Sequence, residues 1–316
     1  MSASAKIFIG CMSAFALLII AGLFLPDWAM FLATIAFAKG LVSLGIICLM
    51  RAGLVSFGQG LYYCIGAYVA AFMSGWTGIT DIALLTVLGI SSAAIIGAIF
   101  GPLLANYRGI FFAMLSLSLS MILYGTLAKM NVIGGTDGLN VAAPTFLGYH
   151  PSGRDLGFAL FIFTSLMVVL ACGAMRIFFD SERGLILLGI RENELRIEYL
   201  GSSVRRAISI AYVFAAGLGG AGGVIAALAI GHVDPEFAFW TTSGEFVFVG
   251  ILSGFYSVGA VFVSSIILEL VRSFSNLYFP TTWQLSLGVF LLIVIYLLPN
   301  GLGSLLSKRD RERKGT

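Results

Sequence analysis

Long apolar blocks divide this sequence, with short polar breaks between them. The blocks lie at about 7–25, 28–50, 54–75, 82–105, 109–128, 156–178, 207–231, 244–272 and 284–298. Most are long enough for a helix of about 20 residues, which crosses roughly 30 Å of hydrocarbon. Hydrophobic residues make up 59% of the chain and charged residues 10%, against about 45–50% and about 25% in soluble domains. We therefore predict an all-α integral membrane protein, a polytopic helical bundle of about 8–10 transmembrane segments.

The positions of the cationic residues predict which ends of these helices face the cytoplasm. The breaks at Lys6, Arg51 and Arg108, together with residues 176–206 and 308–314, hold 14 of the 18 Lys and Arg residues. Because lysine and arginine are enriched in cytoplasmic loops, we place these breaks in the cytoplasm. The breaks within 129–155 and 232–243 carry acidic residues and few cations, and we place them outside.

The segment 244–272 is predicted to turn back within the membrane. A single crossing there would put the basic tail, residues 307–316, on the outer face, against the distribution of the other cations. The segment contains Gly250, Gly254 and Gly259, so we predict a re-entrant or broken-helix pair. Irregular backbone at membrane depth must be buried in protein or line a wet cavity, which makes this segment a pathway candidate. We expect one permease domain over residues 1–306, with its first helix retained.

Several classes of protein are disfavoured by what the sequence lacks. The net charge of +3 is small and the cations are scattered, so no nucleic-acid partner is expected. The four cysteines lie within apolar blocks at no metal-ligand spacing, so we expect neither a metal site nor a disulfide. No phosphate-binding loop of the form G-x-x-x-x-G-K-[ST] occurs, so any ATP must be bound by a partner. His150 and His232 both lie in outer breaks, away from other catalytic residue types, and we do not expect an enzyme.

A glycine-rich run at 217–222 matches the dinucleotide-binding pattern but lies inside an apolar helical block. The dinucleotide pattern requires a preceding strand, which this context does not offer. We interpret the glycines as small residues that let helices pack closely. The same interpretation applies to three pairs with a spacing of four, Gly97/Gly101, Gly219/Gly223 and Gly250/Gly254.

Lys39 is a charged residue near the middle of the second apolar block. A charge at the bilayer midplane costs at least about 2.5–3.5 kcal/mol on insertion scales, so the side chain needs a partner. One candidate is an ion pair with Glu245 or Glu269, and the other is an anionic group of the transported molecule. Alternate serines of the fifth block spread around its helix, so Ser116 or Ser120 is a further pathway candidate, although such serines often bond their own helix carbonyls.

The longest cytoplasmic break, residues 179–206, has a helical pattern of its own. Residues 189–201 contain spaced apolar residues and end at Gly201, which predicts a short helix. Two interpretations of this helix are open. It is either a solvated loop helix or a helix that docks on another protein.

Several short motifs occur along the chain from about residue 30 to residue 305. They are Arg51–Gly60 with Gly66–Tyr68, Phe112–Leu117, Gly134–Leu139, Pro235-Glu236, Trp240–Glu245 and Leu298–Leu302. Together with the loop at 179–206, these motifs resemble the branched-chain amino-acid family of ABC importer permeases, specifically its M-type subunit. Each motif is weak alone, and their conjunction in one order is specific.

The resemblance implies an assembly and a set of functional residues. Such permeases lie in the bacterial inner membrane, pair with a second, H-type permease, sit on two cytoplasmic ATPase subunits and receive substrate from a periplasmic binding protein. On this basis Arg191, Glu192, Asn193 and Glu194 belong to a coupling helix that seats in an ATPase groove. No cofactor is expected in this chain, because the ATPase subunits bind the ATP.

The resemblance also suggests the substrate. Leucine, isoleucine or valine is expected, translocated along a path that includes Lys39, Gln59, Ser116, Ser120 and Glu245. Lys39 is not expected in that helix of the family, and Gln59 stands where histidine is common, so urea, amides or a small organic acid are alternative substrates. An ion-coupled secondary transporter is a further alternative, for which Glu245 and Glu269 are the available intramembrane acids.

Overall fold

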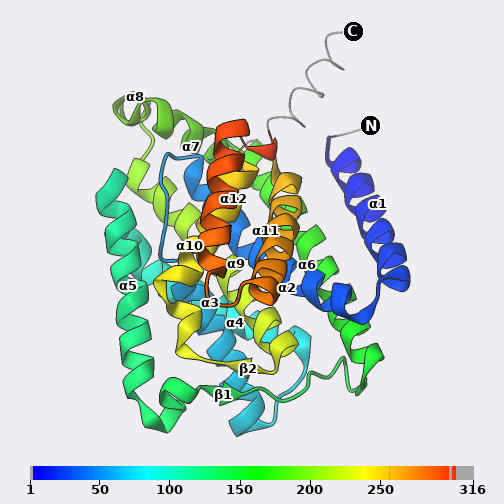
Figure 1. The fold of residues 1–316 in the computed structure, drawn as a ribbon. Helices are drawn as coiled ribbons and strands as arrows, with labels where there is room; N and C mark the ends of the chain where they lie inside the picture. The colour runs from blue at the N-terminus through cyan, green and yellow to red at the C-terminus, as the bar shows by residue number, and fades with distance from the viewer. Residues whose placement is uncertain (1–2, 256, 299–300, 304–316) are drawn as a thin grey trace.

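The fold is described from a computed structural model, for residues 3–255, 257–298 and 301–303 (Figure 1). Helices dominate this part of the chain, which confirms the predicted all-α class. They are α1 (Ala3–Phe24), α2 (Asp27–Met50), α3 (Gln59–Phe72), α4 (Ile82–Leu104), α5 (Gly109–Lys129), α6 (Arg154–Asp180), α7 (Glu182–Glu192), α8 (Glu194–Tyr199), α9 (Val204–Ile230), α10 (Trp240–Ser253), α11 (Val258–Tyr278) and α12 (Trp283–Leu297).

Within the described residues, six helices are long and apolar enough to cross a membrane. They are α2, α4, α5, α6, α9 and α11. Two shorter apolar stretches, Met12–Phe24 of α1 and Trp283–Leu297 of α12, add to these. The half-length helices α3 and α10 have 14 residues each, too few to cross about 30 Å of hydrocarbon alone.

Helix α9 forms the centre of the bundle because its small residues let three helices pack closely against it. It packs mainly on α2, α3 and α4. A methyl group at Gly219 would lie 2.9 Å from Cβ of Tyr62, and one at Gly223 would overlap the backbone of Tyr63. The interpretation of this glycine run as a packing surface is therefore confirmed. The helix begins at Ser203, whose hydroxyl accepts the backbone N–H of Arg206, and ends at Gly231 with φ of 76°.

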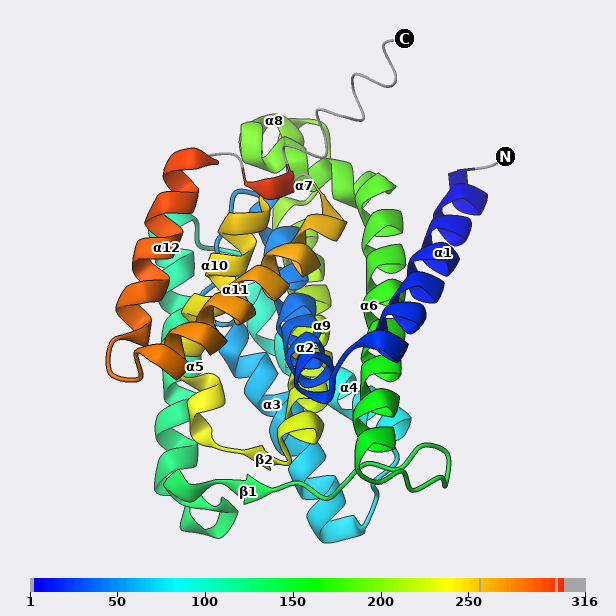
Figure 2. The same ribbon diagram turned by 45° about the vertical axis from the view of Figure 1, so that its right-hand side comes forward.

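The predicted broken-helix pair is confirmed. Helix α10 ends at Gly254, whose φ of 68° favours glycine, and α11 begins four residues later. In Figures 1 and 2, α10 runs toward the end of the bundle that carries α7 and α8, α11 runs back, and α12 returns to the same end. Helix α1 begins at this end too (Figure 2). The predicted basic tail, 307–316, lies outside the described residues.

The opposite end of the bundle brings the two segments predicted to lie outside into contact (Figure 2). The short strand β1 (Leu139–Asn140) pairs antiparallel with β2 (His232–Val233). Between β1 and α5 lie two single 3-10 turns, η2 (Asn131–Ile133) and η3 (Gly135–Asp137). Only the start of the 232–243 segment lies at this end, because the chain then runs inward through the 3-10 turn η4 (Pro235–Ala238) to α10.

Two predicted elements differ from the structure. The third apolar block, 54–75, was expected to be one helix, but residues 54–58 are not helical, α3 begins at Gln59, and a π-helical turn, η1 (Met73–Thr77), ends the element. Its first residues are buried by neighbouring helices, so their apolar character reflects burial and not helix formation. The segment 189–201 was expected to be one helix and is split at Asn193 into α7 and α8.

Candidate functional site

Two half-length helices begin inside the bundle, and their first turns meet there. The backbone N–H of Gly60, in the first turn of α3, donates to the hydroxyl of Ser243, in the first turn of α10, at 3.1 Å. A methyl group at Gly60 would lie 2.5 Å from that hydroxyl, so glycine permits the contact. Because α3 then runs to the end with β1 and α10 to the end with α7, this contact lies between the two faces of the bundle.

The two serines predicted for the pathway hold the non-helical segments that precede these half-helices. Ser116 accepts the backbone N–H of Phe57 at 3.2 Å, and Ser120 donates to the carbonyl of Ala238 at 2.7 Å. Both serines are fully buried near the middle of α5. Buried backbone groups outside helices need such partners, so α5 satisfies what the broken helices leave unpaired. A direct contact of either serine with substrate stays a prediction.

Gln59, the other polar residue at this junction, is fully buried at the start of α3. Neither its amide nitrogen nor its amide oxygen has a hydrogen-bond partner among the described residues. The amide oxygen faces α9, where it lies 3.4 Å from the position a methyl group would take at Gly219. A buried amide without partners costs about 1–3 kcal/mol, so Gln59 is one group of this junction with bonding capacity left for a polar ligand or water.

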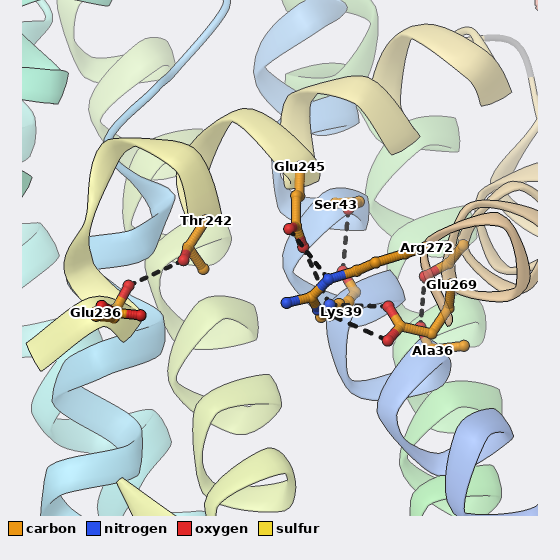
Figure 3. A network of polar contacts seen from close by, with 9 residues as sticks. Ala36, Lys39, Ser43, Glu236, Thr242, Glu245, Glu269 and Arg272 are labelled. Carbon is orange, nitrogen blue, oxygen red and sulfur yellow. Dashed lines mark hydrogen bonds and ion pairs between the residues drawn. The ribbon is translucent and has the colours of Figure 1, made fainter. Parts of the chain in front are cut away.

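A four-charge cluster lies beside the junction and contains Lys39 (Figure 3). The Nζ atom of Lys39 contacts an oxygen of Glu245 at 3.0 Å and an oxygen of Glu269 at 2.8 Å. Arg272 completes the cluster, with its Nε 3.3 Å from Glu245 and an Nη 3.7 Å from Glu269. The ion-pair partner expected for Lys39 is therefore present, and both candidate acids are used at once.

The cluster ties the broken-helix pair to α2. Lys39 lies near the middle of α2, Glu245 on α10, and Glu269 and Arg272 on α11. Its two cations and two carboxylates sum to zero net charge, which is what a low-dielectric interior requires. A role for Lys39 or Glu245 in binding substrate stays a prediction, since each already has protein partners. Arg272 was not predicted, although its spacing of three residues from Glu269 is a pattern that sequence inspection can find.

The segment predicted to be cytoplasmic forms a compact surface around Asn193, which separates α7 from α8. The Asn193 side chain accepts the backbone N–H of Arg196 and so starts α8. Glu194 receives two hydrogen bonds from the guanidinium of Arg108, at 2.8 and 2.6 Å. Glu192 is exposed and has no ion pair with any residue that the structure describes.

The apolar face of α8 is uncovered. Leu195, Tyr199 and Leu200 are 63%, 88% and 75% exposed and line one hollow. Helix α7, in contrast, buries Leu187 and Ile190 in the bundle. Helix α7 is anchored in the bundle, and the neighbouring α8 exposes an apolar surface. This combination favours the docking interpretation over a solvated loop helix.

Arg191 connects this surface to the interior of the bundle. Its guanidinium carbon lies 3.9 Å from the ring centroid of Phe255, in the turn after α10. Its side chain also packs against Gly53, at the start of the non-helical segment that leads to α3. Nearby, burial lowers the pKa of Arg51, and the charge of Asp180 opposes that effect. No three residues of the types His, Cys, Asp and Glu come together in the described chain as metal ligands.

The chain is similar to known permeases. A comparison with protein families matches residues 28–298 to "Branched-chain amino acid transport system / permease component". Two relatives are the high-affinity branched-chain amino acid transport system permease proteins LivM of Escherichia coli (strain K12) and Salmonella typhimurium (strain LT2). Each is 26% identical over 300 residues, covering 86% of this chain and 69% of the relative. No solved structure matches the chain.

The match and the helices together identify the class of protein. A match to a permease family and, in the described residues, six helices long and apolar enough to cross a membrane indicate a multi-pass membrane transporter. The matched residues include α2 to α12, and so the half-helix junction, the four-charge cluster and the α7–α8 surface. The chain belongs to the family of branched-chain amino acid transport system permease components.

Proposed function

We propose that this chain is a transmembrane subunit of an ATP-driven importer in a bacterial inner membrane, and that it translocates leucine, isoleucine or valine. In this proposal a second, H-type permease completes the pathway, two cytoplasmic ATPase subunits supply the energy, and a periplasmic binding protein delivers the substrate. The relatives' printed names support the substrate class. The exposed apolar face of α8 is the observation that carries the partner assignment.

The geometry of Arg191 supports a mechanical role for α7 and α8. A movement of α7 reaches the turn after α10 through Phe255 and the segment before α3 through Gly53. Both routes lead to the contact between Gly60 and Ser243, where the half-helices meet. Opening that junction alternately toward each face is the alternating access that importers require.

The junction also offers groups suited to a zwitterionic amino acid. The first turns of α3 and α10 point backbone N–H groups and the positive ends of their dipoles inward, where a carboxylate is favoured. The unpartnered amide of Gln59 lies at the same place. We assign these groups to the substrate carboxylate, and the apolar side chains of the partner permease and of this chain to the branched side chain.

The test is ligand-dependent ATP hydrolysis by the complete complex. The chain would be co-expressed with the products of neighbouring genes, purified and placed in lipid, with substrate presented on the binding protein. Stimulation by leucine or valine supports the proposal. Stimulation by urea, an amide or an organic acid instead would overturn the substrate, and transport driven by a proton or sodium gradient without a co-purifying ATPase would overturn the importer class.

A pair of matched variants tests the α7–α8 surface. Glu192 and Glu182 are exposed acids at opposite ends of α7, without ion pairs to the described residues. Glu192→Ala is expected to lower stimulation strongly while expression persists, because it alters the docking surface. Glu182→Ala is the control and is expected to retain stimulation. Equal losses of ATPase stimulation in both variants would contradict the assignment of the α7–α8 surface as the docking site.

A further inference from the structure

An apolar groove of about 790 Å³ runs along the outside of the bundle. Helices α4 and α6 form its walls and α9 forms its floor. Small residues leave the space open: Ala98 and Ala174 lie on the walls and Gly217 lies on the floor. Exposed apolar side chains such as Ile95, Ile99 and Leu170 stand on the same two walls, so this face is built to contact hydrocarbon.

The groove is longer than one leaflet of a bilayer. It begins beside Arg206, in the first turn of α9, and extends to Ala221 on the same helix. At 1.5 Å per residue, the path from Arg206 to Ala221 is about 22 Å, which exceeds half of a hydrocarbon core of about 30 Å. The groove therefore covers the leaflet on the side of α7 and α8 and reaches past the midplane.

The interfacial end of the groove is cationic. Arg183, in the first turn of α7, and Arg206 both line it, and each is exposed. Neither guanidinium has an ion pair with any residue in the described part of the chain. Arg205, in contrast, donates a hydrogen bond from its Nε to the carbonyl of Pro102 at 3.3 Å. A guanidinium is shaped to bind phosphate oxygens with two parallel hydrogen bonds, so two unpaired arginines at one end form a phosphate site.

We propose that this groove binds an anionic phospholipid of the cytoplasmic leaflet, with the phosphate at Arg183 and Arg206 and an acyl chain along α9. A flexible chain fits the curved space between α4 and α6. An apolar helix would not provide an anionic partner for the two arginines, whereas a phospholipid provides both an acyl chain and a phosphate. The inference stands on the groove and its charges, and does not rest on the proposed importer function.

The first experiment measures lipid retention by native mass spectrometry. The chain, purified in detergent and stripped of lipid, would be titrated with phosphatidylglycerol and, separately, with phosphatidylcholine of the same acyl chains. We expect preferential binding of phosphatidylglycerol. Arg183→Gln combined with Arg206→Gln should weaken that binding on the order of 30-fold, since each cation near an anionic headgroup contributes about fivefold. Equal binding of the two lipids would overturn the proposal.

A charge-matched control separates the groove from general electrostatic attraction. Arg176→Gln combined with Lys129→Gln removes the same charge at positions that do not line the groove. This control should keep wild-type affinity for phosphatidylglycerol. A loss equal to that of the groove variant would show non-specific attraction and overturn the site.

A second variant tests the acyl-chain part without changing charge. Ala98→Trp fills the groove, while Ile99→Trp places the same ring at an exposed position of α4 outside it. We expect only Ala98→Trp to lower phosphatidylglycerol binding, with both variants showing the wild-type elution volume on size exclusion. If Ala98→Trp leaves lipid binding intact and instead prevents co-purification with a second permease, the groove is a protein interface and the proposal fails.

Discussion

Replacing Lys39 with methionine isolates the energetic role of the four-charge cluster. The side chains of Lys39, Glu245 and Glu269 are 7%, 9% and 12% exposed, so the loss of the ammonium leaves buried carboxylates. Arg272 still lies near both acids, at 3.3 and 3.7 Å, so one negative charge remains uncompensated, not two. Breaking a buried ion pair costs about 3–5 kcal/mol, and the remaining arginine, itself 36% exposed, puts the expected loss near 3 kcal/mol.

The assay is thermal unfolding of the purified protein in detergent, followed by transport in lipid. A loss of about 3 kcal/mol corresponds to a fall in Tm of roughly 4–5 °C for a chain of 316 residues, at about 2.1 cal/mol/K of unfolding entropy per residue. Methionine keeps the length and the apolar stem of the lysine, so the change in packing is small and the charge is the main variable. Transport at a temperature where the variant stays folded then reports whether Lys39 also contacts substrate.

A charge-balanced double variant is the control. Lys39→Met combined with Glu269→Gln leaves Glu245 and Arg272, a neutral pair in contact at 3.3 Å. We expect this double variant to recover part of the lost stability, so that the two changes are less harmful together than their sum. A single variant that melts within about 1 °C of wild type, or a double variant as unstable as the sum, would refute the account of the cluster as an interior charge balance.

The remaining predictions concern packing, the half-helix junction and its unpartnered amide. Gly223→Leu should lower stability by at least about 3 kcal/mol, because its side chain would overlap the backbone of Tyr63, whereas Gly244→Ala, with open space around it, should change Tm little. Ser120→Ala should lose about 1–3 kcal/mol, since it leaves the buried carbonyl of Ala238 unpaired, and Ser118→Ala, exposed on the same helix, should be neutral in the same melting assay. Gln59→Leu should leave the Tm within a few degrees, because its amide has no partner among the described residues, but should reduce leucine uptake in proteoliposomes at least tenfold; a large fall in Tm with normal uptake would contradict a ligand-binding role.

The helix arrangement could be predicted from the sequence where the lengths of the apolar blocks and the positions of the cations constrain it together. The basic breaks indicate which helix ends share a face. A single crossing at 244–272 would have put the basic tail on the opposite face, so a turn was predicted within that segment, and the structure places it at Gly254. Lys39 was informative for the same reason. A single cation within an apolar block needs partners, and the chain offers few intramembrane acids, so Glu245 and Glu269 could be named before the fold was known.

The irregular segments could not be predicted, because their stability depends on other parts of the chain. Residues 54–58 are mostly apolar and at least half-buried, which is equally typical of a helix, and their backbone is held by Ser116 from a helix about sixty residues later. The break at Asn193 did carry a local signal, an asparagine followed by Glu194 at a helix start. The pairing of Glu194 with Arg108 has no local signal, since the two residues are 86 positions apart.

The contacts that hold α10 differ in strength, and the weaker contact is expected to break first when α10 moves. Helix α10 is anchored at its side by Glu245, which has two cationic partners in a buried cluster. Near its start it meets α3 through one hydrogen bond, from Gly60 to Ser243, and one edge-to-face ring contact, of Phe246 with Tyr63 at 5.0 Å, each of a kind worth about 0.5–1.5 kcal/mol. A displacement transmitted through Arg191 and Phe255 would therefore tilt α10 about the cluster and break the junction before the anchor. We therefore propose that, in the transport cycle, the four charges act as the pivot of α10 and the junction of α3 with α10 acts as the gate.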